Sequence, residues 1–148
     1  MDLTFRDARR DDLSRIVELI ADDAIASART GAYGEAHERA FAAIAADPGN
    51  ELVVAEADGR VVGVMQLTYI PSISRDAGTR LLVEAVRVDA ALRGAGLGTR
   101  LMEHAHERGR ARGCTLAQLT SDKRRPDAHR FYRALGYEQS HEGFKRAL

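Results

Sequence analysis

One stretch decides the fold: Glu84-Ala85-Val86-Arg87-Val88-Asp89, then Ala90-Ala91-Leu92, then Arg93-Gly94-Ala95-Gly96-Leu97-Gly98-Thr99-Arg100-Leu101-Met102. Val86 and Val88 alternate with polar residues as in a half-buried strand, and from Leu97 onward the apolar spacing becomes helical. Between them, glycines at every second position let the backbone approach a ligand, and the start of the helix directs its unpaired N–H groups at that ligand. The stretch therefore predicts an anion site, most naturally a phosphate site.

The spacing of the glycines distinguishes several phosphate-binding turns. A dinucleotide fingerprint needs its third glycine one residue after Gly98, and a P-loop needs a lysine that this stretch lacks. Arg93-Gly94-Ala95-Gly96-Leu97-Gly98 instead resembles the R-G-x-G-[IL]-G pattern of the GNAT superfamily of acyl-CoA-dependent N-acetyltransferases. The resemblance implies that the turn binds the diphosphate of coenzyme A. A strand-to-helix connection without a ligand is the structural alternative.

A second motif lies nearer the end of the chain. Residues 127–137 resemble the GNAT pattern A-x-x-[FL]-Y-x-x-x-G-[FY], through Ala128, Phe131, Tyr132, Gly136 and Tyr137. The resemblance implies that Tyr132 points at the sulfur of coenzyme A and acts as the general acid, whereas packing on a helix face is the structural alternative.

The resemblance makes acetyl-CoA the co-substrate. In the family, a bulge in the strand before the turn leaves backbone N–H groups free for pantetheine and for the oxyanion, although the alternation of this strand gives no sign of a bulge. Many members have an asparagine where this chain has Arg125, so 123–125 either meets the 3′-phosphate or forms a solvated basic loop. The expected cofactor-binding residues are Val86, Arg87, Val88, Arg93, Gly94, Ala95, Gly96, Leu97, Gly98, Thr99, Arg125 and Asp127.

The chemistry of amide formation requires a base. An alkylammonium group has a pKa near 10.4, so less than about a thousandth of it is nucleophilic at neutral pH. We interpret Glu84 as that base, because many GNAT members place a glutamate on this strand; a salt-bridged strand carboxylate is the alternative. The free amine would attack the thioester directly, and Tyr132 would protonate the departing thiolate. Cys114 follows a helix-ending glycine and is interpreted as a core residue, not as a nucleophile.

Length and composition limit the possible functions. The 148 residues predict one domain, 1–148, which the GNAT resemblance implies is an N-acetyltransferase domain. The formal net charge of zero argues against binding to nucleic acid or to an anionic membrane. The single cysteine and the lack of a signal peptide or membrane span favour the cytoplasm. The five histidines show no ligand spacing, so no metal site is predicted. GNAT proteins are often dimers, which suggests a homodimer.

The pattern of strands and helices predicts an α/β (α+β) fold, and the resemblance implies that it is the GNAT fold, with a mixed, mostly antiparallel sheet of six to seven strands and about four helices. The chain begins with a short strand near Phe5, a helix from Asp11 to Ala24 and a helix from Glu35 to Ala46. Asp58-Gly59 between two β-rich runs predicts a hairpin. After the helix from Leu97 to Arg112, a strand at 115–120 predicts a parallel crossover. A helix from Asp127 to Leu135 and one or two closing strands follow.

The acceptor is the least defined part of the prediction. The last twenty-two residues resemble one branch, the aminoalkylphosphonate N-acetyltransferases, which implies a small amine bearing an anionic group. That branch also uses a divalent metal, which the spacing here does not imply. Candidate acceptor-binding residues are Tyr33, His37 and Tyr69. The alternatives are a non-catalytic acetyl-CoA-binding sensor, a protein or peptide N-acetyltransferase, and a nucleic-acid-binding regulator, which the zero net charge disfavours.

Overall fold

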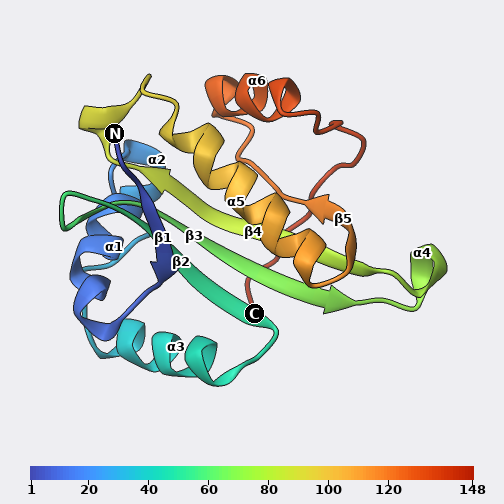
Figure 1. Ribbon diagram of the computed structural model, residues 1–148, viewed down its shortest axis with the longest axis horizontal. Coiled ribbons are helices and arrows are strands. Elements are labelled where there is room, and N and C mark those ends of the chain that lie inside the picture. The colour runs from blue at the N-terminus through green and yellow to red at the C-terminus, as the bar shows by residue number, and fades with distance from the viewer. The chain divides into compact units, whose positions relative to one another are not determined.

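The computed structural model describes every residue from Met1 to Leu148. The chain forms two compact units, Met1–Gln118 and Leu119–Leu148 (Figure 1). The first unit contains β1 (Thr4–Asp7), α1 (Leu13–Ile20), α2 (Ala24–Ser27), α3 (Glu35–Ala46), β2 (Asn50–Ala57), β3 (Arg60–Pro71), α4 (Ser74–Ala77), β4 (Thr79–Val88), α5 (Leu97–Ala111) and β5 (Cys114–Gln118), with short 3-10 helices η1 (Arg10–Asp12) and η2 (Ala90–Leu92).

The five strands form one mixed sheet in the order β1-β2-β3-β4-β5. The first four strands are antiparallel to their neighbours, and β5 runs parallel to β4 after the crossover through α5. The predicted hairpin is confirmed: Asp58 and Gly59, at φ 50° and 73°, connect β2 to β3. Because both turn residues are left-handed, the connection has the twist that adjacent antiparallel strands need.

Helices cover both faces of the sheet. A Cβ added to Gly63 of β3 would lie 2.9 Å from a methyl group of Leu101, which shows how closely α5 packs on that face. Val64, the next residue, points to the opposite face and packs with Leu13 and Ile16 of α1. The predicted amphipathic helix is therefore confirmed from Leu13, but α1 ends at Ile20, and Ala24 starts the separate helix α2.

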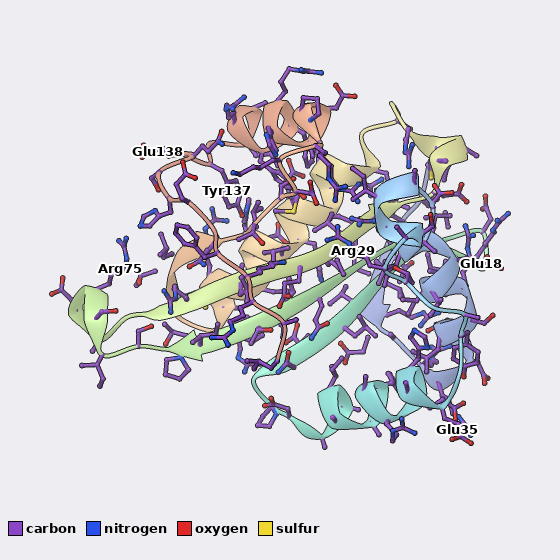
Figure 2. All side chains as sticks on the ribbon, turned by 180° about the vertical axis from the view of Figure 1, so that it is seen from behind. Glu18, Arg29, Glu35, Arg75, Tyr137 and Glu138 are labelled. Atoms are coloured by element: carbon purple, nitrogen blue, oxygen red, sulfur yellow. The ribbon has the colours of Figure 1, made fainter.

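The β3–β4 hairpin is long, because β3 extends to Pro71 and β4 begins at Thr79. The tip carries α4, in which Arg75 and Asp76 have left-handed backbone angles of φ 53° and 57°. Arg75 lies at the far end of this hairpin (Figure 2).

The second unit contains a single helix, α6 (Pro126–Ala134), and no strand. The helix was expected from Asp127 to Leu135, and it runs from Pro126 to Ala134, with Arg125 as its N-cap and Asp127 in its first turn. The expected closing strands are absent: residues 138–148 are all exposed, including Phe144 at 94%. This segment is mostly polar, and Phe144 is its only aromatic residue. The sheet accordingly has five strands and not six to seven, and six α-helices replace the expected four.

No helix combines the length and the apolar composition that crossing a membrane would require.

Candidate active site

A bulge interrupts β4 directly after Glu84. Gln66 pairs with Glu84 and Val64 pairs with Arg87, so β4 uses four residues where β3 uses three. Ala85 takes a left-handed backbone conformation, with φ 53°, to accommodate the extra residue. The sequence showed no sign of this bulge, which was expected from the family resemblance alone, and the structure confirms it.

Beyond the bulge, β4 separates from β5. The parallel pairing covers only Thr79–Leu82 of β4, so its last residues have no paired residue in β5. The N–H of Asp89 donates to the carbonyl of Val62, at 2.8 Å, toward β3. Because successive N–H groups of a strand point to opposite sides, the N–H of Val88 points away from β3. This is the geometry expected of a main-chain donor for a ligand that lies along β4.

The glycine turn connects β4 to α5. Gly94 and Gly96 have φ values of 85° and 78°, so both occupy the left-handed region that other residues adopt at a cost. Gly96 is the N-cap of α5 and has no side chain to satisfy the first N–H groups of the helix. Leu97 is 2% exposed and anchors the first turn in the core, next to Gly98 and Thr99. The start of α5 is therefore a fixed set of N–H donors suited to a diphosphate.

Charged residues anchor the turn to α1 and to the segment after it. Asp89 accepts a hydrogen bond from the N–H of Ala91 at 3.0 Å and forms an ion pair with Arg15 at 2.6 Å. The Ala91 N–H is the main cause that lowers the pKa of Asp89, with Arg15 contributing. Arg93 is the one cationic side chain of residues 93–99, is largely exposed, and forms an ion pair with Asp22 at 3.2 Å. Arg93 is thus held beside the turn.

Glu84 lies on the face of the sheet that α1 and α3 cover in part. Its partner across the β3–β4 ladder is Gln66, and directly opposed residues of antiparallel strands share a face. The Glu84 carboxylate is exposed and has no hydrogen bond or ion pair in the structure. The salt-bridged alternative for Glu84 therefore does not apply. An unpaired carboxylate beside a bulged strand can accept a proton from a bound amine.

A polar network that sequence reasoning missed lies next to Glu84. Asn50 Oδ1 accepts hydrogen bonds from Gln66 Nε2 at 3.2 Å and from Thr68 Oγ1 at 2.9 Å. The available signal was the alternation in β3, where Gln66 and Thr68 are the polar positions between Met65, Leu67 and Tyr69.

Tyr132 belongs to the second unit, on α6. Its ring makes edge contacts with Phe131 at 5.2 Å and with Tyr137 at 6.0 Å between centroids. Tyr137 lies where the chain leaves α6 (Figure 2), and its N–H donates to the carbonyl of Tyr132 at 3.1 Å. Burial, with the neighbouring Tyr132, raises the pKa of Tyr137 to about 12. Tyr137 therefore stays protonated at neutral pH. That Tyr132 and Glu84 lie at one site stays a prediction.

The basic loop before α6 is partly neutralised within the second unit. Arg124 forms an ion pair with Asp122 at 2.9 Å, which raises the pKa of Arg124. Asp127 forms an ion pair with Arg130, and Arg125 donates its N–H to the carbonyl of Asp122 at 3.0 Å. The predicted roles of Arg125 and Asp127 in cofactor binding stay predictions.

The three candidate acceptor-binding residues are not brought together. Tyr33 donates its hydroxyl to Glu38 at 2.7 Å and stacks on His37, with ring centroids 6.0 Å apart. Tyr69 pairs with Leu81, three residues before Glu84, and so faces the α5 side of the sheet, opposite to Glu84. It is 7% exposed beneath Arg112, and burial raises its pKa to about 12. This position favours a packing role for Tyr69.

Burial disfavours the charged forms of Cys114, His104 and His106. Cys114 lines a hollow of about 170 Å³ with Leu81, His106 and Arg110, and burial raises the pKa of its thiol, which disfavours the thiolate. Burial also lowers the pKa of His106 and of His104, which stacks on Phe5. The structure holds no group of three or more His, Cys, Asp or Glu residues placed to bind a metal ion.

Within one unit, the fold thus combines an uncapped helix start after a glycine turn, a bulged strand that separates from its neighbour, and an unpaired carboxylate. Comparison with known proteins shows which family has these features. The acetyltransferase (GNAT) family model matches residues 13–137. The chain belongs to the GNAT family. It is an N-acetyltransferase that uses acetyl-CoA, and the family match extends across both units.

Two curated relatives of this GNAT protein are N-acetyltransferases. The chain is 34% identical over 114 residues to the aminoalkylphosphonate N-acetyltransferase of Salmonella typhimurium, covering 77% of this chain and 73% of that protein. It is 38% identical over 85 residues to the glucosamine 6-phosphate N-acetyltransferase of Trypanosoma brucei brucei, covering 57% of this chain and 54% of that protein.

Solved structures agree with the GNAT fold. A protein from Bacillus halodurans described as a transcriptional regulator superposes with a TM-score of 0.95 at 41% identity, covering 99% of this chain and 100% of that one. A putative acetyltransferase from Agrobacterium tumefaciens superposes with a TM-score of 0.85 at 28% identity, covering 98% and 99% of the two chains.

Proposed function

We propose that this GNAT enzyme transfers the acetyl group of acetyl-CoA to the primary amine of a small molecule that also carries an anionic group, such as an aminoalkylphosphonate. The transfer is a direct attack within a ternary complex. The observation that carries the proposal is the unpaired Glu84 carboxylate, on the same strand as the bulge and directly before the glycine turn.

Each residue of the site has a role in this reaction. The N–H groups of Leu97, Gly98 and Thr99, with the Arg93 guanidinium, hold the diphosphate of acetyl-CoA. The N–H of Val88 orients the pantetheine arm and the thioester carbonyl. Glu84 accepts the proton that the ammonium group must lose before its nitrogen can attack. Tyr132 donates its proton to the departing sulfur.

The charges around Glu84 support an acceptor that is both cationic and anionic. Arg80 and Arg87 lie on the same face of β4 as Glu84, because Arg80 is four residues before it and Arg87 pairs with Val64 on that face. One carboxylate between two guanidinium groups matches an ammonium group linked to an oxyanion. Both curated relatives are named for amines that bear a phosphonate or a phosphate.

We further propose that both units form one catalytic domain, 1–148, that acts in the cytoplasm as a homodimer. The family match from residue 13 to residue 137 supports the single domain, because it includes Glu84 and Tyr132 together. A single cysteine suits a reducing compartment. The dimer is inferred because GNAT proteins are often dimers.

The experiment that tests the proposal measures thiol release from acetyl-CoA with a panel of amines. We expect 2-aminoethylphosphonate to exceed 2-aminoethanol, which carries the same amine without the phosphonate, by about tenfold or more in kcat/KM, the equivalent of one charge-assisted hydrogen bond. Polyamines and peptide amino termini complete the panel. Equal rates for the two matched amines would refute the anionic acceptor, and faster peptide acetylation would favour a protein substrate.

The role of Glu84 is tested by Glu84→Gln. Calorimetry should show unchanged coenzyme A affinity, while turnover at pH 7 falls by about 10² to 10⁴, the usual contribution of a general base. Turnover should recover as the pH rises, because each pH unit increases the neutral amine about tenfold. A variant as active as the parent at pH 7 would remove Glu84 from the mechanism.

A second candidate role is that of an acetyl-CoA sensor, because the Bacillus halodurans relative is described as a transcriptional regulator. The zero net charge of this chain gives it no general attraction for DNA. Coenzyme A binding without thiol release for any amine would favour this candidate.

A further inference from the structure

The side-chain amide of Gln66 has an orientation that the surrounding hydrogen bonds fix. The chain of bonds begins at Asp47, whose carboxylate accepts the N–H of Gly49 at 2.8 Å and Nδ2 of Asn50 at 2.7 Å. These two hydrogen bonds lower the pKa of Asp47, so its carboxylate is ionised and can only accept. The nitrogen of Asn50 must therefore face Asp47.

The orientation of Asn50 determines that of Gln66. With its nitrogen toward Asp47, Asn50 turns Oδ1 to β3, where it accepts from Thr68 Oγ1 at 2.9 Å and from Gln66 Nε2 at 3.2 Å. Because Oδ1 is only an acceptor, Gln66 must present its nitrogen to β2. Its amide oxygen then points away from Asn50.

The amide oxygen of Gln66 is available to a ligand. No protein group donates a hydrogen bond to it, and it is not among the buried atoms that lack a partner, so solvent reaches it. Glu84 faces Gln66 across the β3–β4 ladder, and the Cβ atoms of such a pair lie about 5 Å apart. A neutral acceptor and an unpaired carboxylate thus lie side by side on one face.

We propose that Gln66 is a positioning residue for the acceptor amine, which donates one N–H to Gln66 Oε1 and another to the Glu84 carboxylate. The inference rests on the proposed function and specifies how the same site holds its substrate. The ammonium group passes one proton to Glu84, leaving a neutral amine and a carboxylic acid. The amine keeps two hydrogens, one of them on Gln66, and its freed lone pair is the nucleophile.

A glutamine suits this role better than a second acid. Two adjacent carboxylates would raise the pKa of Glu84, because each disfavours the charge of the other. The amide oxygen accepts from the ammonium group without that penalty. The Asp47–Asn50 pair supplies the fixed orientation that an amide, free to rotate by 180°, would otherwise lack.

The test compares three variants with 2-aminoethylphosphonate as the acceptor. Gln66→Leu removes the amide oxygen while keeping a side chain of similar size. Gln66→Glu keeps an oxygen that can accept a hydrogen bond from the amine but cannot donate to Asn50. Thr68→Val, the matched control, removes the other hydrogen bond to Asn50. We expect KM for the amine to rise about tenfold or more in Q66L, as for one lost hydrogen bond to a charged group, with a smaller change in kcat.

The conservative variant separates positioning from structure. Q66E should keep KM near that of the parent and move the acidic limb of kcat/KM to higher pH, because the added carboxylate raises the pKa of Glu84. T68V should keep the KM of the parent, and all variants should bind coenzyme A as the parent does. Equal KM values in Q66L and Q66E, or a parental KM in Q66L, would overturn the inference.

A result in which the parent releases no thiol with any amine would refute the proposed function, and it is distinguishable from failure of the inference. In that case a carboxyl ¹³C titration of Glu84 tests the juxtaposition alone. The titration midpoint of Glu84 should lie higher in Q66E than in Q66L. Equal midpoints in the two variants would overturn the placement of Gln66 against Glu84.

Discussion

Replacing Gly96 by alanine tests whether the shape of the turn, and not merely its presence, creates the coenzyme A site. Gly96 has φ 78°, and a Cβ built there meets nothing within 4 Å. Gly113, after the other end of α5, provides a matched control, with φ 76° and the same open surroundings. The two positions flank α5, whose 15 residues span about 22 Å.

The expected magnitudes follow from this match. An alanine forced into the left-handed region costs about 1–2 kcal/mol, and both variants should therefore lose about 2–8 °C in Tm. Only Gly96→Ala should affect the ligand. If the turn relaxes to relieve the strain, one N–H of Leu97 or Gly98 leaves the diphosphate, and the loss of one hydrogen bond to a charged group raises Kd by about 10- to 150-fold.

Calorimetric titration with coenzyme A, together with thermal unfolding of both variants, measures these effects. Gly113→Ala should match Gly96→Ala in Tm and the parent in Kd. If the two variants bound coenzyme A with the same Kd at equal loss of stability, the reasoning that ties the anion site to the backbone of Gly96 would be wrong.

Two further predictions concern catalysis and stability. Tyr132→Phe should lower kcat by about 10²-fold or more while leaving coenzyme A affinity unchanged, since it removes only the proton donor; a kcat equal to that of the parent would exclude Tyr132 as the acid. Hydrogen bonding by Arg6 is the main cause that lowers the pKa of Asp12 in the folded state, and the N–H of Arg9 contributes. The ionised carboxylate therefore stabilises the fold above the unfolded pKa, near 4. This stabilisation is lost as the pH falls through the lower folded pKa. Urea unfolding should therefore show Asp12→Asn destabilised at pH 7 and closer to the parent at pH 3, whereas an equal difference at both pH values would contradict this origin.

Local patterns in the sequence predict most of the fold. The Asp58-Gly59 hairpin, α3 and the strand, turn and helix around Gly96 depend on interactions between near neighbours, which spacing and turn chemistry reveal. The bulge at Ala85 does not, because an alanine in the left-handed region has no signature of its own and is imposed by the strands on either side. Only the family resemblance indicated it.

Motifs in the sequence located the strand and the turn that form the candidate site, but they did not determine its surroundings. Glu84 and Gly96 could be found from motifs, but the face on which Tyr69 lies depends on how far β3 continues. Because β3 reaches Pro71 and pairs Tyr69 with Leu81, this tyrosine points to the α5 side. The Asn50 and Gln66 contact joins two strands, and sequence spacing alone does not set that register.

The separation of β4 from β5 has a consequence for how this enzyme can change. If backbone N–H groups of this strand bind the cofactor as proposed, no side chain is needed there, so most substitutions at Val86 or Val88 would leave the donors intact and only proline would remove one. In the proposed site, selectivity for the amine would instead depend on replaceable side chains such as Gln66. Side chains that bind the amine could therefore change without altering the backbone groups that bind acetyl-CoA. Such changes would allow new acceptors to be selected while the acyl donor stays constant.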